Sequence, residues 1–276
     1  MSLFIASLNS GSNGNCYYVG NNQEAVLVDA GISCLETEKR MKRLGLSLAK
    51  VKAIFISHEH SDHIRGVEVL SRKYKLPVYI SPKTHLYSRL QLEEQLQKPF
   101  QTEETVQIGN LQIKAFSKLH DAVDPHSFMI SCNNINVGVF TDIGSACKNV
   151  IRYFKQCHAV FMEANYDDEM LLKGRYPHHL KNRIRGGKGH LSNTQALKVF
   201  AEHRAVFMSH LLLSHLSKDN NCPDLVQQLF TAKANGTEII VASRYQESNV
   251  YHIDGSFTAD STLVKTVEEP LQLSLF

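Results

Sequence analysis

The segment ISHEHSDH, residues 56–63, constrains the fold of this chain more than any other short stretch. It places three histidines, a glutamate and an aspartate directly after the apolar run VKAIFIS. His58 and His60 stand two positions apart, so their imidazoles point the same way on an extended or tightly turned backbone. Asp62 and His63 follow at once. Imidazole nitrogens and carboxylate oxygens are the usual ligands of zinc and related ions. Because one ion rarely takes four ligands from one segment, the loop predicts two adjacent ions.

The composition is that of an ordinary globular protein, with 276 residues, 43% hydrophobic and 21% charged. The longest apolar runs, such as AVLV and LLL, are far shorter than the roughly 20 residues that cross a bilayer. The first residues contain no basic segment leading into an apolar one, so we predict a cytoplasmic protein without a membrane contact. The net charge of +3 does not by itself indicate nucleic-acid binding. Six scattered cysteines without a CxxC pair predict small buried residues.

Short β-branched runs alternate with amphipathic segments along the chain, which predicts an α/β fold. With no internal repeat and no long Pro/Gly linker, the sequence favours a single domain over residues 1–276. The stretch EEPLQLSLF is compatible with a docked or a loose tail. The predicted strands are 3–8, 16–20, 25–31, 51–57, 76–81, 111–117, 126–131 and 135–142, and the predicted helices are 34–45, 64–75, 81–97 and 191–203, the last capped by Ser192 or Asn193.

Four further residues follow strand-like runs: Asp29 in LVDAG, His120 in KLHDAVDPHSF, Asp142 in GVFTDIG and His215 in LLLSHLS. Each has an ordinary interpretation when taken alone. An aspartate before a glycine is a common turn residue, and a lone histidine is more often solvated or satisfied in the core than a ligand. Their positions after strand-like runs distinguish these four residues from the other aspartates and histidines of the chain.

The motif HEHSDH, together with these four residues in this order, resembles the HxHxDH signature of the metallo-β-lactamase superfamily. The resemblance implies an αβ/βα four-layer sandwich with a dinuclear metal site at one edge. It assigns His58, His60 and His120 to one ion, Asp62, His63 and His215 to the other, Asp142 as the bridge between them, and Asp29 to hydrogen bonds that fix the loop. These donors suit two zinc ions, and manganese also accepts mixed nitrogen and oxygen sites.

The segments GHLSNTQALKVF and VFMSHLLLSHLS look like those of tRNase Z-like phosphodiesterases. In such enzymes a histidine before a helix approaches the scissile phosphate, which here is His190. Glu163, in VFMEAN, matches the acidic residue that orients this histidine. A nearby carboxylate raises an imidazole pKa and favours proton donation to a leaving oxygen. Alternatively, Glu163 is a strand-end residue with unrelated hydrogen bonds.

The most extensive resemblance covers nearly the whole chain. SGSNGNCYYV, SHEHSDHIRGV, EANYDDEML, GRYPHHLKNRI, GKGHLSN and LSHLSKDNN are similar to the YycJ/WalJ family of bacterial proteins with the metallo-β-lactamase fold. Members are described as DNA exonucleases that act from 5′ ends. The resemblance therefore implies a phosphodiesterase in which Asp62 also positions the attacking water and His190 assists the leaving oxygen. The chain departs from the family at Tyr166, where a histidine is typical, and no role is transferred to it.

A basic segment at residues 173–190 contains no acidic residue. Such charges contact backbone phosphates independently of base sequence, in a salt-dependent manner. Tyr176, within it, is a candidate for stacking on a base. An ordinary solvated surface is the alternative. Its basic residues are Lys173, Arg175, Lys181, Arg183, Arg185 and Lys188.

Three other functions remain open at this stage. An RNA-processing nuclease of the tRNase Z type shares the chemistry, although no insertion obviously supplies the arm that such enzymes use to hold tRNA. A small-molecule ester or thioester hydrolase uses the same kind of site, but the basic segment argues against it. A metal-binding signalling partner without important catalysis is the third, although the complete ligand set argues for an enzyme. The substrate is expected to be a nucleic acid, with DNA implied by the family resemblance and RNA left as the alternative, and the sequence shows no evident need for a protein partner.

Overall fold

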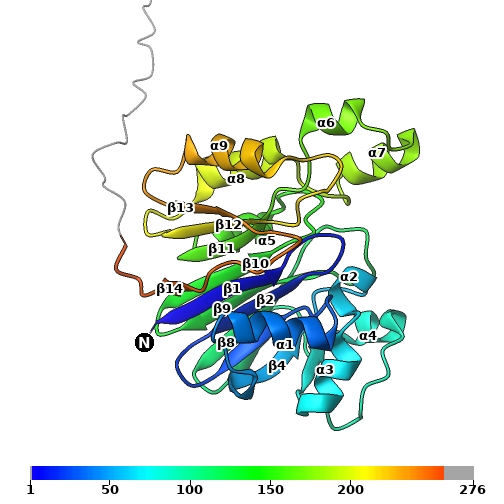
Figure 1. The fold of residues 1–276 in the computed structure, drawn as a ribbon, viewed down its shortest axis with the longest axis vertical. Helices are drawn as coiled ribbons and strands as arrows, with labels where there is room; N and C mark the ends of the chain where they lie inside the picture. Colours follow the sequence, from blue (N-terminus) through cyan, green and yellow to red (C-terminus); the bar gives the residue numbers. More distant parts are fainter. Residues whose placement is uncertain (1, 258–276) are drawn as a thin grey trace, which may run out of the picture.

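The computed structural model describes residues 2–257, in which two seven-stranded sheets pack face to face (Figure 1). The stretch EEPLQLSLF lies outside the described residues. In order across the first sheet the strands are β14 (Tyr251–Ile253), β1 (Leu3–Asn9), β2 (Cys16–Gly20), β3 (Ala25–Val28), β4 (Val51–Phe55), β5 (Val78–Ile80) and β6 (Gln97–Pro99). In the second sheet they are β13 (Glu238–Val241), β12 (His210–Ser214), β11 (Ala159–Glu163), β10 (Ile135–Phe140), β9 (His126–Cys132), β8 (Leu111–Ser117) and β7 (Thr105–Ile108).

Each sheet combines an antiparallel part with a parallel part. Strands β3 to β6 are parallel in the first sheet, as are β10 to β13 in the second. Parallel strands are usually buried on both faces, and this explains their nearly continuous apolar sequences. In β12, for example, Leu212 packs between the two sheets, whereas Leu211 and Leu213 pack beneath helices.

Helices cover the outer face of each sheet and complete four layers. The first sheet carries α1 (Cys34–Arg43) and α3 (Val67–Tyr74), and the second carries α5 (Lys148–Phe154), α8 (Asn193–His203) and α9 (Pro223–Thr231). The shorter elements are η1 (Leu48–Lys50), α2 (Ser61–Ile64) and α4 (Pro82–Ser88), together with α6 (Asp168–Lys173) and α7 (His178–Arg185), which project from the body at the upper right of Figure 1. The predicted four-layer αβ/βα fold is confirmed.

Two of the predicted helices are wrong in their extent. The helix expected at 64–75 is interrupted at Gly66, where an added Cβ would lie 1.9 Å from the carbonyl oxygen of Ile32. The helix expected at 81–97 ends at Ser88 because Arg89 adopts a left-handed conformation with φ 57°. At the predicted helix 191–203, Ser192 is the cap, with a capping box to Gln195.

None of the helices within residues 2–257 combines the length and the apolarity that crossing a bilayer requires. All six cysteines belong to this part of the chain and are free thiols. Four of them are buried, as predicted, whereas Cys147 and Cys222 are partly exposed.

Candidate metal centre

The candidate site residues gather because strands of both sheets end at the same edge of the molecule. In the first sheet, Asp29 directly follows β3 and His58 comes soon after β4. In the second, Glu163 ends β11, Asp142 comes soon after β10, and His215 directly follows β12. The carboxyl ends of neighbouring parallel strands lie side by side, so residues far apart in sequence become neighbours there.

Three of these residues turn the chain sharply at the end of their strand. Asp29, Asp142 and His215 have φ values of 59°, 53° and 57°. Aspartate and histidine enter this left-handed region more readily than most residues, but at some cost in conformational energy. Such backbone geometry concentrates at functional sites, where the surrounding structure holds it in place.

Three histidines form the first cluster. The Nδ1 atom of His60 lies 3.0 Å from His58 Nε2 and 3.4 Å from His120 Nε2. The Nδ1 of His120 lies 3.0 Å from the carbonyl oxygen of Gly189, which can only accept, so the His120 proton is on Nδ1 and the Nε2 lone pair faces the cluster. Burial lowers the pKa of His120 to about 4 and that of His58 well below its usual value. Both rings are therefore neutral, as metal ligands must be.

The second cluster consists of Asp62, His63 and His215. Asp62 Oδ2 lies 3.4 Å from His215 Nε2 and 3.6 Å from His63 Nε2. Burial works against ionisation of Asp62, but His63 and His215 lower its pKa to about 2. Conversely, burial lowers the pKa of His63, but the carboxylates of Asp142, Asp29 and Asp62 outweigh it and raise that pKa to about 10. The carboxylates around this cluster therefore favour positive charge within it.

Asp142 lies between the two clusters. Its Oδ1 is 3.9 Å from His120 Nε2 and 3.5 Å from His215 Nε2, and its Oδ2 is 3.0 Å from His63 Nε2. Although that last distance is short, the geometry is not that of a hydrogen bond, and the buried Oδ2 has no hydrogen-bond partner among the described residues. A buried carboxylate oxygen needs a partner. With converging imidazole nitrogens on both sides, this donor set fits divalent metal ions.

Asp29 supports the loop that carries the histidines. Its Oδ1 accepts the backbone N–H of Ser57 at 2.8 Å, and its Oδ2 accepts the Ser57 hydroxyl at 2.8 Å. The same Oδ2 lies 2.7 Å from His63 Nδ1, which leaves Nε2 facing the second cluster. The Ser57 hydroxyl also lies 2.9 Å from His58 Nδ1. Ser57, which the sequence did not single out, therefore contacts ligand candidates of both clusters.

His190 and Glu163 form a hydrogen-bonded pair beside the second cluster. His190 Nδ1 lies 2.6 Å from Glu163 Oε1, while Glu163 Oε2 accepts the N–H groups of Ile143 at 2.7 Å and Leu191 at 3.1 Å. Glu163 is completely buried, yet His190 keeps its pKa at about 2. The rings of His190 and His215 stack with centroids 5.3 Å apart. Glu163 is therefore an ionised carboxylate that fixes His190 at the edge of the cluster.

The segment SGSNGN, residues 10–15, reaches the second cluster. The backbone N–H of Asn15 donates to the Asp62 carbonyl at 2.7 Å. The side-chain Nδ2 of Asn15 lies 3.1 Å from His63 Nε2 and 3.3 Å from Asp62 Oδ2. Gly31 permits this approach, since a Cβ there would lie 1.7 Å from the Asp62 carbonyl oxygen. Only the Gly- and Asn-rich composition of the segment could have indicated this role.

A buried hydrogen-bond chain extends from Asn15 to His215. The Tyr17 hydroxyl donates to Asn15 Oδ1 at 3.1 Å and lies 2.8 Å from Ser10 Oγ. Ser10 Oγ in turn accepts the backbone N–H of His215 at 2.7 Å. This chain fixes Asp62 and His215 relative to each other, although the two residues lie 153 positions apart.

Most of the predicted basic segment lies in α7 and the residues around it, which together with α6 are here called the helical arm (residues 168–188). Five of its six predicted cations are exposed, and Lys181 is half-buried. Several already have partners: Lys173 pairs with Glu169, and Arg183 pairs with Asp121 beside His120. The structure thus separates the arm from the buried clusters but connects it to the loop of His120.

The two tyrosines near the arm lie outside the clusters. Tyr166, where the family typically has histidine, is buried and lines a cavity of about 310 Å³ between α6 and α7. Tyr176 donates its hydroxyl proton to Asp219 Oδ2 at 2.9 Å and is half-buried.

The fold and the site define a metallohydrolase of the metallo-β-lactamase class. Residues 10–133 match the family described as the metallo-beta-lactamase superfamily. The structure resembles that of the metallo-beta-lactamase fold protein YhfI from Bacillus subtilis, with a TM-score of 0.70 and 17% identity, over 91% of this chain and 100% of that one.

Curated relatives identify the family more narrowly. The chain is 37% identical to exodeoxyribonuclease YycJ of Bacillus anthracis, over 82% of this chain and 87% of the relative. It is 32% identical to exodeoxyribonuclease WalJ of Streptococcus pneumoniae, over 79% and 83%. The chain belongs to the YycJ/WalJ family, as the sequence motifs predicted.

Proposed function

We propose that this protein is a phosphodiesterase with two divalent metal ions, zinc or manganese, that shortens DNA from its 5′ end. The names of the YycJ and WalJ relatives support an exonuclease of DNA. We further propose that residues 1–276 act as one domain in the cytoplasm. In support, the two sheets share one buried core.

The Glu163–His190 pair beside the double cluster carries this proposal. An ester with a good leaving group needs no proton donor, whereas an alkoxide leaving from a phosphodiester does. His190 Nδ1 is engaged by Glu163, so Nε2 is the nitrogen that remains for a substrate, in a side chain that is 19% exposed. In the proposed reaction His190 Nε2 donates its proton to the leaving oxygen, and Glu163 stabilises the positive ring beforehand.

Two cations would be held by His58, His60 and His120 on one side and Asp62, His63 and His215 on the other, with Asp142 between them. Divalent ions in such an arrangement supply an activated water and neutralise the charge of a phosphodiester. Asp62, whose side chain is 18% exposed, accepts a hydrogen bond from the attacking water and orients it. The exposed cations of the helical arm bind the sugar-phosphate backbone beyond the site.

The test is cleavage of end-labelled single- and double-stranded DNA and RNA by protein loaded in parallel with zinc and with manganese. Asp62→Ala serves as the control for contaminating nuclease. We expect progressive, metal-dependent shortening of DNA from the 5′ end, absent in the variant. Equal or faster cleavage of RNA would identify an RNA-processing enzyme instead, and no cleavage of any polymer by fully metallated protein would refute the proposal.

A further inference from the structure

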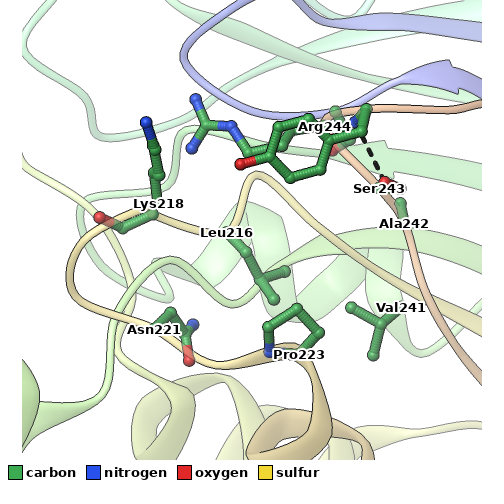
Figure 2. A pocket seen from close by; sticks show the side chains of 11 residues that line it. Leu216, Lys218, Asn221, Pro223, Val241, Ala242, Ser243 and Arg244 are labelled. Carbon is green, nitrogen blue, oxygen red and sulfur yellow. Dashed lines mark hydrogen bonds between the residues drawn. The ribbon is translucent and has the colours of Figure 1, made fainter.

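A pocket of about 230 Å³ opens beside the metal centre and is not part of it (Figure 2). Its walls come from three separate segments: the end of β1, the loop between β12 and α9, and the residues at the end of β13. The lining residues are Ser10, Leu216, Ser217, Lys218, Asn221, Pro223, Val241, Ala242, Ser243, Arg244 and Tyr245.

The pocket has a cationic end and an apolar end. In Figure 2 the side chains of Lys218 and Arg244 lie together at one end, whereas Leu216, Pro223 and Val241 lie at the other. An anionic group joined to a flat apolar one matches this division. A nucleotide has both parts, a phosphate and a base, and bases stack readily on apolar and aromatic side chains.

The guanidinium of Arg244 is only partly satisfied by hydrogen bonds within residues 2–257. Its Nη2 donates to Ser12 Oγ at 3.3 Å, but its Nη1 is buried and has no hydrogen-bond partner within residues 2–257. A buried guanidinium N–H without an acceptor is costly, and a phosphate oxygen is the acceptor that arginine binds best. Lys218, which is exposed at the same end, adds a second positive charge.

Two residues that line the pocket adjoin His215 of the metal centre. Leu216 follows His215 in the chain, and Ser10, another lining residue, accepts the backbone N–H of His215 at 2.7 Å. His215 stacks on His190, which the proposed mechanism places at the leaving oxygen. In the proposed reaction, the water oxygen bonds to phosphorus and the P–O3′ bond breaks, so the shortened strand keeps a 5′-phosphate and the 3′ oxygen of the terminal nucleotide leaves with the proton from His190. This nucleotide therefore lies on the side of His190 and His215.

We propose, on the basis of the function proposed above, that this pocket binds the 5′-terminal nucleotide of the strand. Arg244 and Lys218 bind its 5′-phosphate, and its base lies against Leu216, Pro223 and Val241. Tyr245, 72% exposed at the rim, covers the outer face of the base. The pocket thereby selects phosphorylated strand ends over internal positions and over 5′-hydroxyl ends.

The first test compares oligonucleotides that differ only in a 5′-phosphate or a 5′-hydroxyl. For Arg244→Gln and Lys218→Gln we expect KM for the phosphorylated strand to rise about tenfold, as for loss of a charge-assisted contact, with kcat nearly unchanged. The unphosphorylated strand should be cleaved as by the unaltered protein. Lys155→Gln, an exposed cation at the end of α5, is the matched control. If neither pocket variant differs from this control on either substrate, the pocket does not bind the terminal phosphate.

A second measurement separates this proposal from the proposed function. Calorimetric binding of deoxyadenosine 5′-monophosphate and of deoxyadenosine to the metal-loaded protein requires no cleavage. We expect the monophosphate to bind more tightly, and this preference to fall in both variants, including Lys218→Gln, whose exposed position spares the fold. Binding with this pattern but without nuclease activity would retain the pocket and refute the nuclease. Nuclease activity with unchanged monophosphate binding in both variants would refute the pocket alone.

Discussion

The metal centre and the helical arm both carry many charged residues, but they hold them in opposite ways. In the centre, Asp142 and His63 are buried and each faces several charged partners. On the arm, exposed cations such as Lys173 form single pairs with neighbours at the surface. Exposed pairs contribute little and are screened by salt, whereas breaking a buried charge network is costly. Substitutions in the centre should therefore nearly abolish activity. Substitutions on the arm should lower the affinity for DNA by degrees, in a manner that depends on salt.

The largest effect is expected at Asp142, because it lies between both clusters. We expect Asp142→Asn to lower kcat by about 10³-fold or more, since it removes a charge that both ions would share. Metal content measured by mass spectrometry should fall at the same time. Asp224→Asn, an exposed aspartate in the first turn of α9, should change neither quantity. Full activity of Asp142→Asn with two bound ions would remove the bridging role.

A smaller but still large effect is expected at His190, which forms a hydrogen bond with Glu163 and belongs to neither cluster. His190→Ala should lower kcat by about 10²- to 10³-fold, as for loss of a general acid. Metal content should remain unchanged, which distinguishes this variant from Asp142→Asn. A substrate with an activated leaving group, such as a nitrophenyl phosphodiester, should be cleaved with little loss. An equal loss on both substrates would contradict proton donation by His190.

An intermediate effect is expected where hydrogen bonds hold the ligands. Asn15→Ala and Ser57→Ala should each weaken metal binding by about 10- to 100-fold, the usual cost of losing an outer hydrogen bond at a metal site. Titration of metal-free protein with zinc in a competing chelator measures this. Activity at saturating metal should recover in large part. Unchanged affinity in both variants would mean that neither side chain supports the ligands.

The smallest effect is expected on the arm. The double variant Arg175→Gln/Lys188→Gln should raise KM for DNA several-fold and leave kcat unchanged, since both side chains are exposed. The slope of log affinity against log salt should fall by about 1.4 for single strands. A large loss of kcat would instead place the arm within the reaction itself and would end the contrast with the centre.

The sequence predicted the parts of the site that are local or that end a strand. His58, His60, Asp62 and His63 stand within six residues, so their proximity follows from chain connectivity alone. Asp142 and His215 were predicted because each follows a strand-like run and their order matches the motifs of the metallo-β-lactamase superfamily. The structure brings them together because parallel strands place their carboxyl ends side by side. The α/β class was predicted from the alternation of strand-like and amphipathic segments along the chain, and the four-layer sandwich was implied by the family resemblance.

The parts that sequence reasoning missed depend on contacts between distant segments. Ser10 and His215 are 205 positions apart, and Asn15 and Asp62 are 47 apart. No periodicity or motif encodes such contacts. The end of α4 was also missed, since apolar residues continue in a helix-like pattern beyond Arg89, and only the left-handed backbone there ends the helix.

The left-handed backbone at Asp29, Asp142 and His215 lowers stability locally and places their side chains at the site. Glycine adopts this conformation without strain, so glycine at Asp142 or His215 would relax the backbone, but it would also break the buried charge network. The same change would abolish metal binding. These positions therefore keep a strained backbone because their side chains serve both the buried charge network and the candidate metal site.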